Sequence, residues 1–267
     1  MDALHIEVTG KGPPLVLLHG WAMHGGIFAP LVAQLATQRT LYVVDLPGHG
    51  HSRSSAVSLA PENCARAILE AVPAAPWCGW SLGGLIALQA ALLAPQQVSK
   101  LAMLCATPKF VLAEDWPQGM SRDVFTGFEA GLRSDWRATI DRFIALEAFG
   151  SDQMREELKL LRDAVLERGE PSTRVLQEGL QVLESSDLRE HLPALQVPSV
   201  WIAGRRDRLV NPQAMQASAQ LSPNARYVQI EHAGHAPFLT HAQAVAEVLV
   251  GFLQKNEESL VYECNIV

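Results

Sequence analysis

The sequence predicts an α/β fold with a mostly parallel central sheet, helices on both faces of that sheet and a helical lid inserted between two of its strands. Three observations support this prediction. Short continuous apolar runs alternate with longer helical stretches in the first and last parts of the chain, as in parallel sheets whose strands are buried on both faces. Between residues 109 and 192 the alternation stops and only helical patterns remain. A pentapeptide of the form G-x-S-x-G, residues 79–83, stands between an apolar run and a helical stretch.

The elements before the pentapeptide follow from hydrophobic patterning and turn residues. Alternating apolar and polar residues indicate an edge strand, whereas unbroken apolar runs indicate strands buried on both faces. Pro61 favours a helix start because proline fits the first helical turn. The expected elements are an edge strand at 4–8, buried strands at 15–18 and 41–44, and helices at 27–35 and 62–72.

The remaining elements divide into a core part and a lid part. In the core we expect strands at 76–78, 98–105, 199–204 and 226–230, and helices at 82–93, 212–221 and 241–253. In the lid we expect amphipathic helices such as 135–149, 151–168 and 172–183. The predicted organisation is therefore an α/β core formed by 1–108 and 193–258, a lid at 109–192, and a tail at 259–267 to which we assign no role.

Composition excludes several classes of protein. The chain has 267 residues, of which 48% are hydrophobic, enough for one large domain with a sizeable core. A formal net charge of −7 argues against a nucleic-acid or anionic-membrane binder. No apolar run reaches the roughly 18 residues of a membrane span, and the start of the chain lacks a secretory signal pattern. We therefore expect a monomeric cytoplasmic protein with no nucleic-acid or membrane partner.

The cysteines indicate reduced thiols and not a disulfide framework. Cys64, Cys78, Cys105 and Cys264 are scattered and form no C-x-x-C pair. Such a distribution is typical of buried thiols in a reducing compartment.

The G-x-S-x-G pentapeptide has the sequence context of a nucleophile elbow. Gly79 and Gly83 flank Ser81 and lack the Cβ atoms that would clash where a strand and the next helix approach each other. The serine is expected to adopt a strained backbone conformation, with its hydroxyl exposed above the first turn of that helix. The pentapeptide alone also fits an ordinary Gly/Ser loop before a helix.

Two further residues complete a candidate catalytic triad with Ser81. His235 can accept the serine proton, and Asp207 can hold the imidazole in the useful tautomer. Both follow predicted strands, so they lie at the edge of a parallel sheet where ligands bind. Asp45 is a rival acid that more plausibly stabilises a turn, and His232 is a rival base in the same loop as His235. We prefer His235 because Gly234 permits an abrupt turn before it.

An oxyanion needs two backbone donors. The amide of Leu82, the first residue of the helix after Ser81, is one candidate, and the amide of Trp21 is the other. His19, just before this loop, is interpreted as a structural residue that orients it. The other histidines are not spaced with carboxylates as metal ligands would be, so no metal and no cofactor are predicted.

These motifs together resemble the α/β-hydrolase superfamily over almost the whole chain. The resemblance rests on five segments: 19–21 (His-Gly-Trp), 45–50 (Asp-Leu-Pro-Gly-His-Gly), 79–84 (Gly-Trp-Ser-Leu-Gly-Gly), Asp207, and 234–237 (Gly-His-Ala-Pro). Segments 17–23, 79–84, 142–146 and 235–238 resemble more specifically the pimeloyl-[acyl-carrier protein] methyl ester esterases of biotin synthesis. The superfamily's usual N-terminal strand region looks shortened here, which predicts a sheet of about seven strands.

The resemblance implies which residues contact the substrate. The implied substrate contacts are Trp21, Ser81, Leu82, Phe143, Ile144, Ala145, Leu146, Glu147 and His235. Glu147 differs from the uncharged amide that the family has at this position. The implied partner is an acyl-carrier-protein-linked ester, and because that carrier is acidic its docking face should be basic. Candidate docking residues are Arg137, Arg142, Arg155, Lys159 and Arg162.

The charge of the lid limits this docking hypothesis. Arg155, Lys159 and Arg162 fall on one face of a predicted helix. Residues 109–192 nevertheless contain 11 Lys/Arg and 17 Asp/Glu, a net charge of −6. Any attraction must come from this local stripe, and a solvated face of mixed charge is the alternative.

The predicted activity is that of a serine carboxylesterase that hydrolyses the methyl ester of pimeloyl-[acyl-carrier protein] through an acyl-enzyme, and that also accepts short-chain esters. The same triad serves lipases, thioesterases and carbon–carbon bond hydrolases, because fold and triad do not select the substrate. Lyase or haloperoxidase chemistry, and a ligand receptor that keeps the triad, remain alternatives on the same fold.

Overall fold

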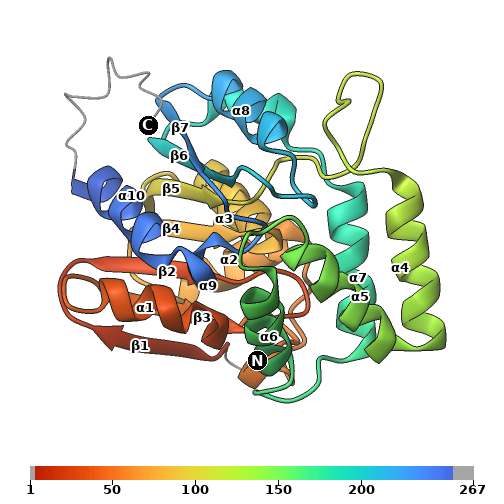
Figure 1. Ribbon diagram of the computed structural model, residues 1–267. Helices are drawn as coiled ribbons and strands as arrows, with labels where there is room; N and C mark the ends of the chain where they lie inside the picture. The colour runs from red at the N-terminus through yellow and green to blue at the C-terminus, as the bar shows by residue number, and fades with distance from the viewer. Residues whose placement is uncertain (1–3, 255–267) are drawn as a thin grey trace.

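A single sheet organises the protein. The computed structural model describes residues 4–254, and within them one seven-stranded sheet has the order β1-β3-β2-β4-β5-β6-β7 (Figure 1). All neighbouring strands are parallel except β1, which pairs antiparallel with β3. The strands are β1 Ile6–Gly10, β2 Pro14–Leu18, β3 Thr40–Val44, β4 Ala75–Trp80, β5 Val98–Leu104, β6 Ser199–Gly204 and β7 Ala225–Ile230. The mostly parallel sheet is as predicted.

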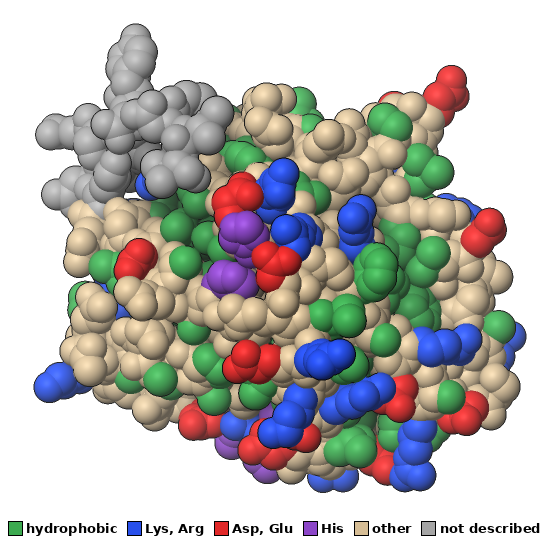
Figure 2. Space-filling model, in the orientation of Figure 1, with side chains coloured by type: hydrophobic (Ala, Val, Ile, Leu, Met, Phe, Trp, Pro, Cys, Tyr) green, Lys and Arg blue, Asp and Glu red, His purple; other side chains and the backbone are tan. Residues whose placement is uncertain are grey.

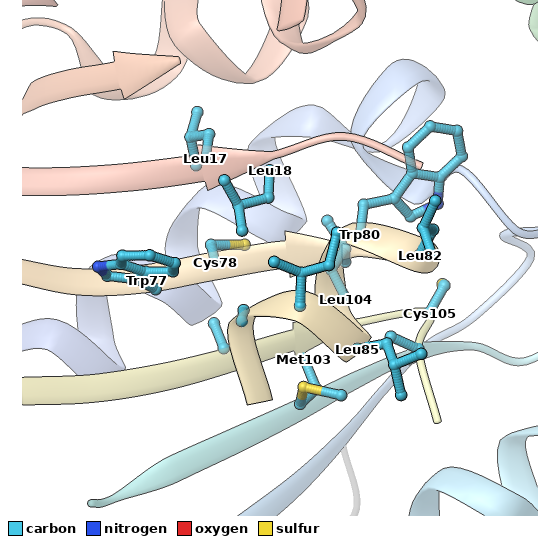
Figure 3. Close-up of a cluster of buried hydrophobic side chains, with 14 of the residues drawn as sticks. Leu17, Leu18, Trp77, Cys78, Trp80, Leu82, Leu85, Met103, Leu104 and Cys105 are labelled. Carbon is cyan, nitrogen blue, oxygen red and sulfur yellow. The ribbon is translucent and has the colours of Figure 1, made fainter. Parts of the chain in front are cut away.

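The centre of the sheet is buried on both faces. β6 is buried at every position, and β2 and β4 are nearly so, because their sequences are continuous apolar runs. Figure 3 shows side chains of β2, β4, β5 and the start of α3 packed against one another, with Trp77 in the middle of β4 and Trp80 at its carboxyl end. Because the strands are parallel, their carboxyl ends share one edge, and the loops that leave this edge carry the candidate site.

Helices cover both faces of the sheet. Figure 1 shows α1, α9 and α10 in front of the sheet and α2 and α3 behind it. The bounds are α1 Ala29–Leu35, α2 Pro61–Ala71, α3 Leu82–Leu93, α8 Pro212–Leu221, α9 Pro237–Thr240 and α10 Ala242–Gln254. Helix α3 is apolar around its whole circumference, so it is the most deeply buried of them.

A helical segment separates β5 from β6. Residues 105–198 contain two isolated bridges but no strand, and they form α4 Arg122–Ser134, α5 Trp136–Ala148, α6 Met154–Val165, α7 Thr173–Ser185 and the 3-10 helix η3 Arg189–Ala194. Side-chain oxygens cap three of the helices: Ser121 begins α4, Asp135 begins α5 and Ser172 begins α7. Figure 1 shows α4, α5 and α7 beside the sheet edge from which the site loops emerge, with α6 in front.

Several helices differ from the sequence predictions in their bounds or in their existence. The helix predicted at 27–35 begins at Ala29, because Gly25–Phe28 form a 3-10 turn capped by His24. The helix predicted at 151–168 is shorter, since Ser151 caps a turn before Met154. The helix predicted at 241–253 is preceded by the separate short helix α9. Helix α4 was not among the predicted elements, and the predicted tail at 259–267 lies outside the described residues.

None of the helices in the described part of the chain combines the length and apolar character needed to cross a bilayer. The described cysteines, Cys64, Cys78 and Cys105, are free and buried. Burial raises the pKa of the Cys64 and Cys78 thiols, that of Cys78 to about 12, so these cysteines are inert core residues.

Candidate active site

Ser81 lies in the turn between β4 and α3 in a strained backbone conformation. Its φ and ψ angles are 54° and −119°, a region that residues with a Cβ rarely adopt. Its amide donates to the Leu104 carbonyl at 3.1 Å, which anchors the turn to β5. The side chain is buried, with 3% exposure, under the lid helices. The strained turn predicted from the pentapeptide is confirmed.

The glycines around Ser81 are required by close approach of three backbone segments. A Cβ on Gly79 would lie 2.2 Å from the Gly83 carbonyl oxygen, and one on Gly83 would lie 2.3 Å from the Leu18 carbonyl oxygen. A Cβ on Gly20 would lie 3.2 Å from the Cβ of Ser81, so the loop after β2 passes directly beside the serine. The predicted clash between strand and helix is therefore real, and it extends to a second strand, β2.

His235 and Asp207 form a buried pair. His235 Nδ1 donates to Asp207 Oδ2 at 2.8 Å, and neither side chain is exposed. The other carboxylate oxygen of Asp207 accepts from the amides of Leu209 and Val210 at 2.8 and 2.9 Å. With the carboxylate held on both oxygens, the imidazole has one orientation and one tautomer.

The second imidazole nitrogen of His235 has no hydrogen-bond partner among the described residues. His235 Nε2 is fully buried and forms no hydrogen bond with any residue in 4–254. The ring of Trp80, the residue before Ser81, lies 5.6 Å from the His235 ring, and its indole Nε1 donates to the His235 carbonyl at 2.9 Å. The His235 loop is thus tied to the end of β4, and Nε2 remains free to take part in proton transfer.

The rival acid and base are engaged elsewhere. Asp45 accepts from the amides of Gly25 and His51 at 2.7 and 2.8 Å and pairs with Arg168, so it stabilises the turn after β3. His232 is exposed, and its Nδ1 lies 2.7 Å from Asp152 Oδ2. The positive φ of this loop, 65°, belongs to His232 and not to Gly234.

The loop after β2 brings Trp21 to the serine. The backbone amides of Trp21 and Leu82 donate to no backbone carbonyl of the described chain, so both are available as donors. His19 orients this loop, as expected: its Nδ1 donates to the Gly20 carbonyl and its Nε2 accepts from the Leu46 amide. Burial lowers the pKa of His19 to about 3, so the ring is neutral and keeps both hydrogen bonds at neutral pH.

Aromatic side chains of α4 and α5 pack against Trp21 in this loop. The indole of Trp21 is fully buried, and its Nε1 donates to the Leu176 carbonyl in α7 at 2.8 Å. Phe143 of α5 packs edge-on against Trp21 with ring centroids 4.7 Å apart. Phe128 of α4 contacts both rings, at 6.4 and 5.7 Å, and was missed in the sequence because α4 itself was not predicted. These three rings form an apolar cluster around the Trp21 side chain.

The predicted lid contacts are not equivalent. Phe143, Ile144 and Glu147 are buried, whereas Leu146 is half-buried and Ala145 is exposed on the outer face of α5. Ala145 therefore lies away from the aromatic cluster, as expected for a residue two positions from Phe143 on a helix.

Two lid carboxyl groups are buried beside the His235 loop. Glu147 is 1% exposed and neither carboxyl oxygen has a partner among the described residues. Burial, then the nearby Glu157 and Asp207, raises the pKa of Glu147 well above its usual value. Glu157 was not singled out in the sequence, where it is one of several glutamates on an amphipathic helix.

One group of side chains in the described chain has metal-ligand geometry. Ligand atoms of Cys105, Asp207 and His235 all lie within 4.8 Å of one another. Burial raises the pKa of the Cys105 thiol, and a protonated thiol is a poor ligand. The Asp207–His235 hydrogen bond already uses the other two groups, so this cluster is better explained as part of the candidate triad.

The five candidate docking residues are all exposed on the lid. Three of them form ion pairs within the lid: Arg137 with Glu170, Lys159 with Asp163 and Arg162 with Asp141. Arg142 donates to Thr139, and Arg155 forms no ion pair with a described residue. Figure 2 shows Lys and Arg side chains gathered over α5 and α6 with Asp and Glu side chains between them.

The family comparison matches most of the chain. Residues 13–242 match the family described as alpha/beta hydrolase fold. A pimeloyl-[acyl-carrier protein] methyl ester esterase from Stenotrophomonas maltophilia is 56% identical over 250 residues, which cover 94% of this chain and 96% of the relative. A protein of the same name from Xanthomonas campestris is 53% identical over 250 residues, 94% of this chain and 98% of the relative.

Solved structures are similar in fold at low identity. An esterase from Exiguobacterium antarcticum superposes with a TM-score of 0.83 at 24% identity and covers 94% of this chain and 96% of its own. A bromoperoxidase from Bacillus anthracis has a TM-score of 0.84 at 22% identity, covering 94% of this chain and 95% of its own. An enol-lactonase from Burkholderia xenovorans has a TM-score of 0.81 at 23% identity, covering 94% and 96%. Their different chemistries illustrate that this fold does not by itself select a reaction.

Proposed function

The chain belongs to the alpha/beta hydrolase fold family, and on this premise we propose that it is a serine carboxylesterase with the triad Ser81, Asp207 and His235. Its substrate is the methyl ester of pimeloyl-[acyl-carrier protein] in biotin synthesis, and it also hydrolyses short-chain esters. The observation that carries the proposal is the buried 2.8 Å hydrogen bond from His235 Nδ1 to Asp207 Oδ2. The other nitrogen of the same imidazole, Nε2, is left unpartnered beside the strained serine turn.

The reaction follows from the chemistry of these groups. His235 Nε2 accepts the proton of Ser81 as the hydroxyl attacks the ester carbonyl, and Asp207 stabilises the imidazolium that forms. The amides of Trp21 and Leu82 hold the oxyanion of the tetrahedral intermediate. The imidazolium then gives its proton to the departing methoxy oxygen, so that methanol is released. The acyl group stays bound to Ser81 as an acyl-enzyme. A water molecule activated by the same nitrogen attacks this ester and releases the carboxylic acid.

The acyl chain requires an apolar wall, which Trp21, Phe128 and Phe143 supply beside the serine. In this proposal residues 109–192 act as a lid over the core, and the carrier remains outside it. The enzyme is proposed to act in the cytoplasm as a monomer, needing neither metal nor cofactor. The substrate assignment is supported by the names of relatives that are more than 50% identical over nearly the whole of both chains.

The test of the catalytic assignment is Ser81→Ala. Removing the nucleophile is expected to lower turnover of p-nitrophenyl acetate and of the carrier-linked methyl ester by about 10⁴-fold or more, without loss of folding. The control is an unchanged far-ultraviolet circular dichroism spectrum. Turnover by the purified variant within about tenfold of wild type would refute the assignment.

A local basic stripe is proposed to dock the acidic carrier. Arg155 and Lys159 lie on the exposed face of α6, and neither is required by the triad. The double variant Arg155→Glu with Lys159→Glu should lower kcat/KM for the carrier-linked ester while sparing p-nitrophenyl acetate. An equal loss on both substrates would remove the docking proposal and leave the esterase proposal intact.

Other hydrolase reactions on the same triad are separated by substrate panels. Rates on p-nitrophenyl esters of rising chain length should favour short chains, whereas a lipase would favour long ones. The physiological substrate is tested by asking whether the gene restores biotin-independent growth to a strain that lacks the methyl ester esterase. Failure to restore growth, together with good short-chain esterase activity, would favour another esterase role.

A further inference from the structure

The loop that carries His235 is clamped from two sides. On the sheet side, Trp80 Nε1 donates to the His235 carbonyl and Asp207 holds the ring. On the lid side, the contacts come from α5 and from the first turn of α6. There the His235 amide donates to the Glu147 carbonyl at 3.4 Å, and the Ala236 amide donates to Glu157 Oε1 at 3.4 Å.

Glu147 contacts this loop through its backbone carbonyl, whereas Glu157 contacts it through its carboxyl group, which can carry a charge. Its side chain has no solvent exposure. Besides the Ala236 amide, its carboxyl group accepts from the Ser151 side chain, while Oε2 has no partner among the described residues. A Cβ on Gly234 would lie 3.5 Å from Oε1, so the carboxyl group lies directly against the chain on both sides of His235.

We propose that Glu157 is a positioning residue for His235: it holds the histidine loop against the lid and, when ionised, stabilises the imidazolium that forms during ester cleavage. This inference rests on the proposed function, because it assigns Glu157 a part in the same proton transfer. Asp207 would then be assisted by a second carboxylate that comes from the lid and not from the core. The lid would contribute to the reaction as well as covering the substrate.

The groups that face Glu157 make its charge sensitive to pH near neutrality. They are Glu147 from α5, Cys105 from the end of β5, Asp207 from the loop after β6, and His235. Burial raises the pKa of Glu157 to about 7, against the hydrogen bonds from Ser151 and Ala236 and the attraction of His235. Cys105 is protonated at this pH because burial raises its pKa well above its ordinary value, and burial likewise raises the pKa of Glu147.

The direction of the effect follows from these charges. Below about pH 6 Glu157 is protonated, and it can hold the loop but cannot stabilise a cation. Above about pH 8 it is ionised and faces the imidazolium inside a poorly solvated site, where a charge pair is strong. The contribution of Glu157 to kcat should therefore rise with pH through neutrality.

The experiment compares kcat for p-nitrophenyl acetate in wild type and Glu157→Gln from about pH 5.5 to 8.5. Glutamine keeps the acceptor for the Ala236 amide and removes the charge. The ratio of wild-type to variant kcat is expected to rise from about one at the acid end to about tenfold at the alkaline end. The matched control is Glu156→Gln, the exposed neighbour on α6, for which the ratio should stay near one at every pH.

A melting measurement excludes a folding defect. A carboxyl group whose pKa is raised in the folded state makes the wild type less stable as pH rises from the unfolded value through about 7. Glu157→Gln should therefore melt at or above the wild-type temperature at alkaline pH.

A kcat ratio that is the same at every pH would overturn the inference, since a purely structural role has no titration. A ratio near one throughout would also overturn it. If Ser81→Ala is inactive while the Glu157→Gln ratio is flat, only this inference fails. If Ser81→Ala retains activity, the proposed function itself fails.

Discussion

At the scale of single residues, Ser81 shows how the site stores strain. Its positive φ of 54° places the hydroxyl above the first turn of α3, and the surrounding glycines allow three backbone segments to meet there. Such conformations cost about 1–3 kcal/mol and persist only where the surrounding structure enforces them. In this protein the enforcing contacts are the Ser81 amide bond to Leu104 and the close packing of Gly79, Gly83 and Gly20.

This strain predicts an unusual order of stability. Ser81→Gly and Ser81→Ala should both be inactive, but the glycine variant should be more stable by about 0.5–2 kcal/mol because glycine adopts positive φ without steric cost. Urea denaturation followed by tryptophan fluorescence measures the difference. The comparison is Ala67→Gly, in the middle of α2, where glycine should cost about 1 kcal/mol. An alanine variant at least as stable as the glycine variant would mean that the turn carries no strain.

At the scale of elements, hydrogen bonds join the loop after β2 to the lid helices α6 and α7. Trp21 bonds to Leu176 in α7, and His24 bonds through Nε2 to the Ala164 carbonyl at the end of α6 at 2.6 Å. Arg168, just after α6, pairs with both Asp45 and Glu7. Helices far along the chain therefore set the position of the Trp21 amide, one of the two proposed oxyanion donors.

A small change in α7 tests this connection. A Cβ on Gly179 would lie 2.6 Å from Trp21 Cδ1, so Gly179→Ala must displace the indole. We expect kcat to fall by about tenfold for carrier-linked and small esters alike, because a misplaced oxyanion donor weakens every transition state equally. The measurement is kcat on both substrates.

The matched control for that experiment is Gly127→Ala in α4, where a Cβ would meet nothing within 4 Å. This variant should keep full activity and gain up to about 1 kcal/mol of stability, since alanine favours a helix more than glycine does. Full kcat in Gly179→Ala, with Gly127→Ala behaving as expected, would show that the indole and the oxyanion donor are independent.

At the scale of the whole molecule, the net charge and the local charge of α6 act in opposite directions on an acidic carrier. The net charge of the chain is −7, so long-range forces repel an acidic partner, whereas the exposed cations of α6 attract it at short range. Salt weakens both interactions, with a screening length of about 8 Å at physiological ionic strength. The sign of the salt dependence therefore reports which interaction dominates.

If the basic stripe dominates, kcat/KM for the carrier-linked ester should fall by about threefold or more as NaCl is raised from about 0.05 to 0.5 M, while p-nitrophenyl acetate is unaffected. In the Arg155→Glu with Lys159→Glu variant the dependence should vanish or reverse. A wild-type rate that increases with salt would show that net repulsion governs the encounter and would argue against docking on α6.

Much of the architecture was predictable because it is encoded locally. Continuous apolar runs identified the parallel strands, and Pro61 and the glycines of 79–83 identified a helix start and the serine turn. The helix over 151–168 was predicted too long because amphipathic periodicity continues through Ser151, whose hydroxyl instead caps a turn. Helix α4 was missed because the 109–121 segment before it contains turn residues and no periodic pattern.

By itself, then, the sequence determined the fold class and predicted Ser81, Asp207 and His235 as the candidate triad in that chain order, because turns and periodicity depend on neighbours along the chain. Only the tertiary structure decided that Glu157 lies against the His235 loop and that α7 binds the Trp21 indole. The physical reason is that these contacts join residues tens of positions apart. Their geometry depends on how the lid helices pack on the sheet edge, which no local spacing specifies.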